Sequence, residues 1–186
     1  MTPLRRRAAL ALLAAPAFGR AAPLPGDSIY QLQATLTDQD GRRFEWSSLR
    51  GRPLLASMFY ASCEMVCPTI FETIHLTLKA LPASDRAPLG VLMVSFDSAR
   101  DSTEVLKKTA ADRHCDARWT LARADEATVR KVAAVLGVQY RRLDSGEFNH
   151  STVIEHIDAE GRIVARSGKL GGVDAALVKS LRAKAG

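Results

Sequence analysis

Two short runs of almost unbroken apolar residues constrain the fold of this 186-residue chain more than any other feature. They are residues 53–60 (PLLASMFY) and 89–96 (LGVLMVSF). Apolar runs of this length, without alternation, are typical of strands that are buried on both faces of a parallel sheet. Between them, residues 68–81 have apolar side chains at helical spacing, and Pro68 would lie in the first turn, where its missing N–H is tolerated. The sequence therefore predicts a buried strand–helix–strand unit.

The remaining elements extend this unit at both ends. Residues 31–36 and 43–46 flank Asp40-Gly41, a dipeptide that favours a hairpin. We further expect a helix capped by Asp101 and ending near Asp112, a strand at 119–122, a helix from Asp125 to Gly137, strands at 151–157 and 162–166, and a helix at 173–184. This order is typical of thioredoxin-like folds. The prediction is an α/β protein with a central mixed β-sheet flanked by helices and an N-terminal β-hairpin.

Residues 1–22 have the three regions of a cleaved secretory signal peptide. Arg5, Arg6 and Arg7 precede the apolar residues 8–15, and small residues follow them. Because a membrane-spanning helix needs ~20 apolar residues, this run is too short to be a permanent anchor. We expect an exported, periplasmic protein, translocated by the Sec or the twin-arginine route. The alternative is an uncleaved N-terminal helix that associates the protein with the membrane surface.

The net charge of +6 is concentrated in that first segment, where no acidic residue precedes Asp27. The rest of the chain has no basic run with interleaved aromatic residues, so we expect no nucleic-acid partner. A linker at residues 23–30 and a single domain at residues 31–186 would complete the chain.

Two cysteines, Cys63 and Cys67, lie where the first apolar strand meets the helix. We expect Cys67 at or beside the N-cap, where free N–H groups and the helix dipole lower the pKa of a thiol. Cys63, on the exposed side of the loop, would be the attacking thiol of a redox-active pair. Four residues apart, the two sulfurs can converge, either in a disulfide or around one soft metal ion.

Four histidines are candidates for a further ligand. We expect His75 and His156 to be ordinary structural side chains and His114 to lie in solvent. His150 differs, because it precedes a strand and follows an irregular loop at residues 141–149, and loops beside rigid strands often carry sites. The pattern alone leaves open whether His150 binds a metal.

Several motifs together resemble the SCO/SenC family of copper-binding, thioredoxin-like proteins, over about residues 32–181. Residues 59–68 (FYASCEMVCP) resemble the metal-binding loop of that family. Residues 94–101 (VSFDSARD) resemble its second-strand signature, and residues 149–151 (NHS) resemble its distal histidine segment. Residues 158–162 (DAEGR) resemble its hairpin.

The resemblance implies one copper ion, as Cu(I) or Cu(II), bound by Cys63, Cys67 and His150. It also implies a copper chaperone that assembles the copper site of a cytochrome c oxidase subunit or another cuproprotein, supplied by an upstream periplasmic donor. Two positions depart from the family pattern: Glu64 stands where proline commonly follows the first cysteine, and Asn149 replaces an aspartate. If that aspartate orients the histidine, this site binds Cu(II) differently.

Other functions stay open at this point. The Cys63–Cys67 pair could instead act as a thiol–disulfide oxidoreductase that keeps a partner's metal-ligand cysteines reduced, served by a thiol reductant. A peroxidase-like reaction is disfavoured by the spacing of the two cysteines and by the match at His150. Zinc fits the same ligands plus water, but the sequence identifies no general base for hydrolysis. Asp97 and Asp101 are candidates to support the site, although helix capping is the expected role of Asp101.

Overall fold

The computed structural model describes residues 23–182, so the expected signal peptide at residues 1–22 lies outside the described part. Within that part, no helix has both the length and the apolar character needed to cross a bilayer. The short 3₁₀ helix η1 (Ile29–Gln31) falls at the end of the segment expected as a linker. Ile29 and Tyr30 belong to the hydrophobic core, and the Ile29 N–H donates to the Gly161 carbonyl. The packed domain therefore begins slightly before residue 31.

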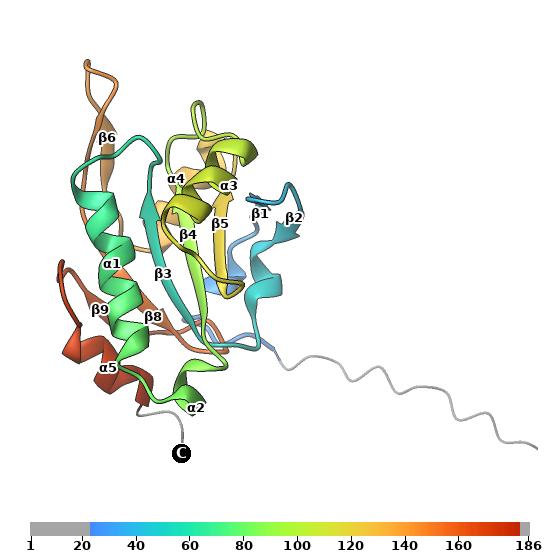
Figure 1. The fold of residues 1–186 in the computed structure, drawn as a ribbon. Helices are drawn as coiled ribbons and strands as arrows, with labels where there is room; N and C mark the ends of the chain where they lie inside the picture. Colours follow the sequence, from blue (N-terminus) through green and yellow to red (C-terminus); the bar gives the residue numbers. More distant parts are fainter. Residues whose placement is uncertain (1–22, 183–186) are drawn as a thin grey trace, which may run out of the picture.

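A seven-stranded mixed sheet in the order β2-β1-β5-β4-β3-β8-β9 forms the centre of the molecule (Figure 1). Its strands are β1 (Thr35–Asp38), β2 (Arg43–Glu45), β3 (Leu54–Phe59), β4 (Gly90–Ser95), β5 (Trp119–Arg123), β8 (Ile154–Ile157) and β9 (Ile163–Ser167). Strands β3, β4 and β5 are parallel, whereas the hairpins β1–β2 and β8–β9 join them through antiparallel pairs. The predicted mixed sheet and N-terminal hairpin are confirmed.

The helices are α1 (Val66–Lys79), α2 (Ala83–Arg86), α3 (Thr103–Asp112), α4 (Glu126–Val135) and α5 (Ala175–Arg182), with a second 3₁₀ helix, η2 (Trp46–Leu49). Helices α1 and α5 lie side by side (Figure 1). Two buried hydroxyl groups of α1, those of Thr73 and Thr77, accept N–H groups of Gly171 and Asp174 in the segment before α5. These bonds hold the C-terminal helix against α1.

The core forms where the two apolar runs predict it. Strands β3 and β4 are buried at all six of their positions. Helix α1 buries Ile70, Phe71 and Ile74, and Phe71 stacks on Trp119 of β5 with ring centroids 5.6 Å apart. Each such side chain contributes about 1.5–3 kcal/mol through removal of apolar surface from water. Because β3 and β4 are parallel, their carboxyl ends meet at one edge of the sheet.

Some local predictions were wrong. Helix α1 begins two residues before Pro68. The N-cap of α3 is Ser102, whose hydroxyl accepts the Val105 N–H, and not Asp101. Asp101 does not cap α3, because its carboxylate accepts the peptide N–H of Ala61, which is distant in the sequence.

The segment expected as an irregular loop is a hairpin. It consists of β6 (Tyr140–Arg142) and β7 (Phe148–His150), which form a separate two-stranded sheet. This hairpin projects past the N-terminal end of α1 (Figure 1). Its turn contains Gly146 at φ 85°, a left-handed conformation that glycine adopts readily. Because most side chains of the hairpin are exposed and polar, apolar periodicity does not reveal it.

Candidate metal centre

Both cysteines lie near the junction of β3 and α1, Cys63 in the connecting turn and Cys67 in the first turn of the helix. After Phe59 the chain turns so that the Cys63 N–H donates to the Tyr60 carbonyl, with N and O 3.3 Å apart. Cys67 is the second residue of α1 rather than its N-cap. Both side chains are buried, at 6% exposure for Cys63 and 3% for Cys67. The expected exposure of Cys63 was wrong, and Met65, at 83% exposure, is instead the residue of this loop that points to solvent.

The two thiols differ in acidity. Burial alone would raise the pKa of Cys63, but the peptide N–H groups of Cys67, Val66 and Met65 lower that pKa below its ordinary value. Burial raises the pKa of Cys67. The prediction that Cys67 carries the lowered pKa was therefore wrong. Free N–H groups of a helix N-terminus point towards the residues that precede the helix, and Cys67 lies within the first turn.

His150, the last residue of β7, completes the group. Within residues 23–182, Cys63, Cys67 and His150 form the one group of three or more Cys, His, Asp or Glu residues whose ligand atoms all lie within 4.8 Å of one another. The Nδ1 atom of His150 lies 3.1 Å from the Ser151 carbonyl oxygen. The Nδ1–H tautomer donates to this oxygen and leaves Nε2 available to a metal.

Aromatic rings pack around the imidazole. The ring centroids of Tyr60 and Phe96 lie 5.9 and 5.1 Å from that of His150, and Phe148 packs against both rings. The Tyr60 hydroxyl donates to the Glu147 carboxylate across 2.6 Å. Burial is the larger cause and this hydrogen bond the smaller cause of a raised pKa of Tyr60, so that its hydroxyl remains a donor at neutral pH. An apolar surrounding of this kind limits solvent access to a metal site.

Two buried carboxylates at the carboxyl end of β4 support the two sides of the centre. Asp101 accepts the N–H of Ala61, two residues before Cys63, across 3.0 Å. Asp97 forms an ion pair with Arg100. The Arg100 guanidinium donates to the carbonyl of Gly146, in the hairpin turn, across 2.8 Å. Asp101 thus contacts the cysteine turn, and Asp97 contacts the histidine hairpin through Arg100.

The other histidines lie outside this group. The Nε2 atom of His75 lies 2.9 Å from the Arg113 carbonyl oxygen. The buried His156 has its Nδ1 atom 2.6 Å from the Ser180 hydroxyl. His114 is exposed. All three have the ordinary structural or solvated environment that the sequence predicts.

Sequence reasoning missed the parts that Glu147 and Arg100 play in this arrangement. The signal was the dipeptide Ser145-Gly146, which marks a turn between two short segments. Recognition of a hairpin there would have placed Glu147 beside the strand that carries His150.

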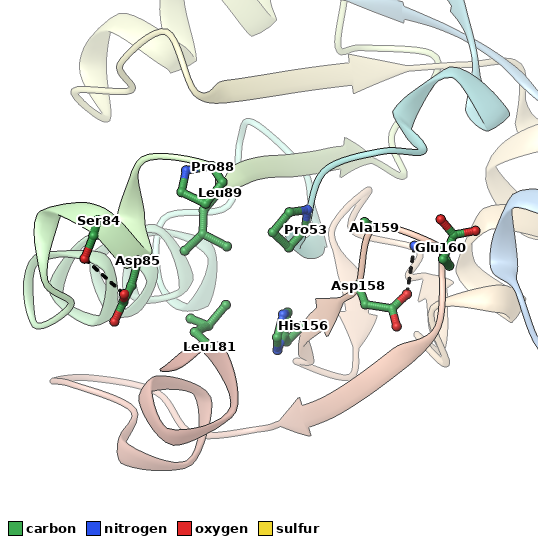
Figure 2. A pocket seen from close by; sticks show the side chains of 10 residues that line it. All are labelled: Pro53, Ser84, Asp85, Pro88, Leu89, His156, Asp158, Ala159, Glu160 and Leu181. Atoms are coloured by element: carbon green, nitrogen blue, oxygen red, sulfur yellow. Dashed lines mark hydrogen bonds between the residues drawn. The ribbon is translucent and has the colours of Figure 1, made fainter. Parts of the chain in front are cut away.

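A cavity of about 590 Å³ lies at the opposite end of β3 (Figure 2). Its walls include apolar residues such as Pro53 and Leu181, together with His156 and acidic side chains. One of these acids, Glu160, pairs with Arg50. The cavity contains none of the three converging residues and is separate from the candidate metal centre.

The donor set of the centre is soft. Two sulfurs and one imidazole nitrogen suit Cu(I), Cu(II) or zinc better than magnesium or calcium, which prefer oxygen ligands. The fold and the site together define a thioredoxin-like protein with a candidate dithiol–imidazole metal centre at the β3–α1 junction.

A sequence profile of the SCO1/SenC family matches residues 25–184. The chain therefore belongs to the SCO1/SenC family, which confirms the resemblance noted in the sequence.

Among curated relatives, the SCO1 protein homolog of Bacillus subtilis is 32% identical over 79 residues, covering 42% of this chain and 40% of the relative. An SCO2-like protein of Rickettsia prowazekii is 27% identical over 133 residues, covering 68% of this chain and 63% of the relative. The chain thus spans less than two thirds of the length of either relative.

Solved structures share the fold. Arabidopsis thaliana ScoI with copper bound has a TM-score of 0.71 at 18% identity, covering 82% of this chain and 98% of that chain. An SCO1/SenC family lipoprotein of Bacillus anthracis has a TM-score of 0.71 at 20% identity, covering 83% and 94%. Bradyrhizobium japonicum ScoI with copper bound has a TM-score of 0.68 at 24% identity, covering 82% and 95%.

Proposed function

We propose that this protein is an exported copper-binding assembly factor that holds one copper ion through Cys63, Cys67 and His150. It accepts copper from an upstream periplasmic donor and delivers it to the copper site of a respiratory cytochrome c oxidase subunit or another cuproprotein. The observation that carries the proposal is the convergence of the three ligand atoms within 4.8 Å of one another. Copper in the structures of two family members supports the choice of metal.

The environment of the centre suits a carrier of Cu(I). Two thiolates bind this soft ion in a low-coordinate site, and the imidazole provides a ligand that Cu(II) also accepts. The lowered pKa of Cys63 favours its thiolate, and metal binding releases the proton of the second thiol. Zinc is the competing ion for the same donors.

An anaerobic competition titration of the reduced protein with Cu(I) and a calibrated chelator tests the proposal. We expect tight one-to-one binding that is lost in Cys63→Ser and weakened in His150→Ala. Cys115→Ser is the matched control, because Cys115 lies outside the converging group. Weak binding that does not depend on His150 would overturn the copper site. Zinc that displaces Cu(I) at equal concentration would overturn the choice of metal.

Delivery and export have separate tests. Mixing the Cu(I)-loaded protein with an apo copper domain of an oxidase subunit should transfer copper, and no transfer would contradict an assembly role. Export rests on the signal-peptide pattern of residues 1–22. Protein recovered from the periplasm should begin near residue 23, and exclusive recovery from the cytosol would contradict export.

A second candidate function is thiol–disulfide exchange by the Cys63–Cys67 pair. It is favoured by the closeness of the two sulfurs and by their unequal pKa values, since a low-pKa thiol is the better attacking group at neutral pH. An oxidoreductase that needs only these two sulfurs keeps its turnover in His150→Ala. A carrier loses copper affinity in the same variant, so this one substitution separates the two functions.

A further inference from the structure

The three candidate ligands are carried by two parts of the molecule that do not share a sheet. Cys63 and Cys67 belong to the β3–α1 junction of the main sheet, whereas His150 belongs to the β6–β7 hairpin. Among the strands of residues 23–182, β6 and β7 are hydrogen-bonded only to each other. The ladders of the main sheet therefore do not by themselves fix the distance between the imidazole and the two sulfurs. Side-chain contacts add to the restraint from residues 151–153, which join the hairpin to β8.

One of these contacts is a hydrogen bond that joins Tyr60 to Glu147. Tyr60 lies three residues before Cys63, and its carbonyl accepts the Cys63 N–H. Glu147 lies three residues before His150. The Tyr60 hydroxyl donates to the Glu147 carboxylate across 2.6 Å, and the Tyr60 ring also packs edge-on against His150. One residue therefore contacts the cysteine turn through its carbonyl and the histidine hairpin through its side chain.

We propose that the Tyr60–Glu147 hydrogen bond is a latch that positions His150 against the two thiols. Tyr60 and Glu147 are thus positioning residues, and their effect on metal binding rests on the proposed copper site. Without the latch, the hairpin spends more time detached from the β3–α1 junction. The apparent affinity for an ion that needs the imidazole is then the intrinsic affinity multiplied by the fraction of molecules whose hairpin is attached. Cu(I) binds mainly to the two sulfurs, which stay on the main body, whereas Cu(II) depends more on the imidazole. Loss of the latch should therefore weaken binding of Cu(II) more than binding of Cu(I).

A contact between Arg100 and the hairpin makes the effect of the latch partial. The Arg100 guanidinium donates to the Gly146 carbonyl and lies 5.9 Å from the centre of the Phe148 ring. This contact remains when the latch is removed. We therefore expect a hairpin that detaches more often, in a protein that otherwise keeps its fold.

The test compares Tyr60→Phe with Tyr140→Phe. Both substitutions remove one phenolic hydroxyl, but that of Tyr140 has no hydrogen-bond partner among the described residues. Glu147→Ala removes the Tyr60–Glu147 hydrogen bond by a change at the exposed partner. It therefore tests the latch even if the Tyr60→Phe protein does not fold. Glu147→Gln keeps an acceptor oxygen and is the conservative variant. Trypsin cleavage after Arg141 or Arg142 in the metal-free protein reports detachment of the hairpin, and Cu(I) and Cu(II) titrations report the metal centre.

We expect about tenfold faster cleavage for Tyr60→Phe and Glu147→Ala, because a hydrogen bond to a charged group is lost. Glu147→Gln should be intermediate and Tyr140→Phe unchanged. In the latch variants Cu(II) affinity should fall about three- to tenfold, and Cu(I) affinity less than about twofold.

Equal cleavage of the Tyr60→Phe and Tyr140→Phe proteins overturns the latch, whatever the copper titrations show. Faster cleavage with unchanged Cu(II) affinity overturns the positioning of His150. Faster cleavage in a protein whose unsubstituted form binds no copper supports the latch and overturns the proposed function instead.

Discussion

The peptide nitrogen of Cys67 lies 3.3 Å from the sulfur of Cys63 and donates a hydrogen bond to it. Helix α1 begins at Val66, so the N–H groups of its first turn have no partner within the helix. They are directed at the thiol that precedes the helix, where they stabilise negative charge. The sulfur of Cys67, inside the helix, is surrounded by the core, and burial raises its pKa by more than a backbone hydrogen bond at Tyr60 lowers it. One helix start thus makes two cysteines of the same motif unequal.

This inequality predicts the order in which the thiols react. In the reduced, metal-free protein, iodoacetamide should alkylate Cys63 before Cys67, because only the thiolate is nucleophilic. The pKa of Cys63 lies below its ordinary value, so the midpoint of its rate against pH should lie below that of a free cysteine in a short peptide. Burial raises the pKa of Cys67 and keeps its reaction slow over this range. Peptide mass spectrometry of samples quenched at intervals measures both rates.

Cys115 is the internal control for this reaction, since burial raises its pKa to about 12. It should react more slowly than Cys63 at every pH up to 9. Faster alkylation of Cys67 than of Cys63 would contradict the assignment of the thiolate.

Substitution of Asp101 should lower the free energy of unfolding by an amount that depends on the residue that replaces it. Its carboxylate accepts the Ala61 N–H and the buried Ser95 hydroxyl, and Asp101→Ala leaves both donors without this acceptor. Each such donor destabilises the fold by about 1–3 kcal/mol, so we expect the free energy of unfolding to fall by about 2–4 kcal/mol in urea titrations. Asp101→Asn keeps a carbonyl oxygen as an acceptor and should lose less than half of that. Equal losses in the two variants would show that these hydrogen bonds do not stabilise the turn.

The same residue has a pH signature. Burial raises the pKa of Asp101 in the folded protein above its ordinary value. By itself, this carboxyl therefore stabilises the fold below its unfolded pKa of ~3.9, and that contribution is lost as pH rises through the folded pKa. Asp101→Asn should remove this component from the pH dependence of the free energy of unfolding. An unchanged slope between the unfolded and the folded pKa would contradict it.

The parts of the fold that follow from local physical chemistry could be predicted from the sequence. The runs at 53–60 and 89–96 are too apolar to be exposed on either face, so they form the central parallel strands. Two cysteines at the end of the first strand must then lie at the edge of the sheet. These inferences need only burial and chain direction.

The remaining features depend on contacts between distant segments, which periodicity does not encode. Asp101 and Ser102 are equally good N-caps, and the choice is made by the Ala61 N–H, which occupies the aspartate. The β6–β7 hairpin packs through Phe148 onto Phe96 and Tyr60, which follow two other strands. The acidity of Cys63 depends on a helix start two residues earlier than Pro68 suggests.

Two hairpin turns predict different responses to the same substitution. Gly41 and Gly161 both have positive φ, 79° and 86°. A Cβ at Gly41 would meet nothing within 4 Å, whereas one at Gly161 would lie 2.5 Å from the Ser28 hydroxyl oxygen and 2.6 Å from the Tyr30 ring. Gly41→Ala should lower the free energy of unfolding by about 1–2 kcal/mol through backbone strain alone. Gly161→Ala should lower the free energy of unfolding by about 1–3 kcal/mol more than Gly41→Ala does, because the buried Tyr30 must shift to make room for the Cβ. Urea denaturation of both variants measures the difference, and equal losses would contradict the close packing at Gly161.

The resemblance to the SCO/SenC family leads us to expect an aspartate at the position of Asn149, and the structure predicts that Asn149→Asp changes little. Side chains alternate along a strand, so Asn149, which is exposed on β7, points away from the face that carries His150. The imidazole is instead oriented by the Ser151 carbonyl, a backbone group that no substitution at position 149 removes. Asn149→Asp should therefore leave Cu(I) affinity and the Cu(II) absorption spectrum unchanged within about twofold, whereas removal of a true orienting partner costs about 10–100-fold. A tenfold change in this variant would mean that the carboxylate reaches the histidine, and that the Ser151 carbonyl is not enough to hold the ring.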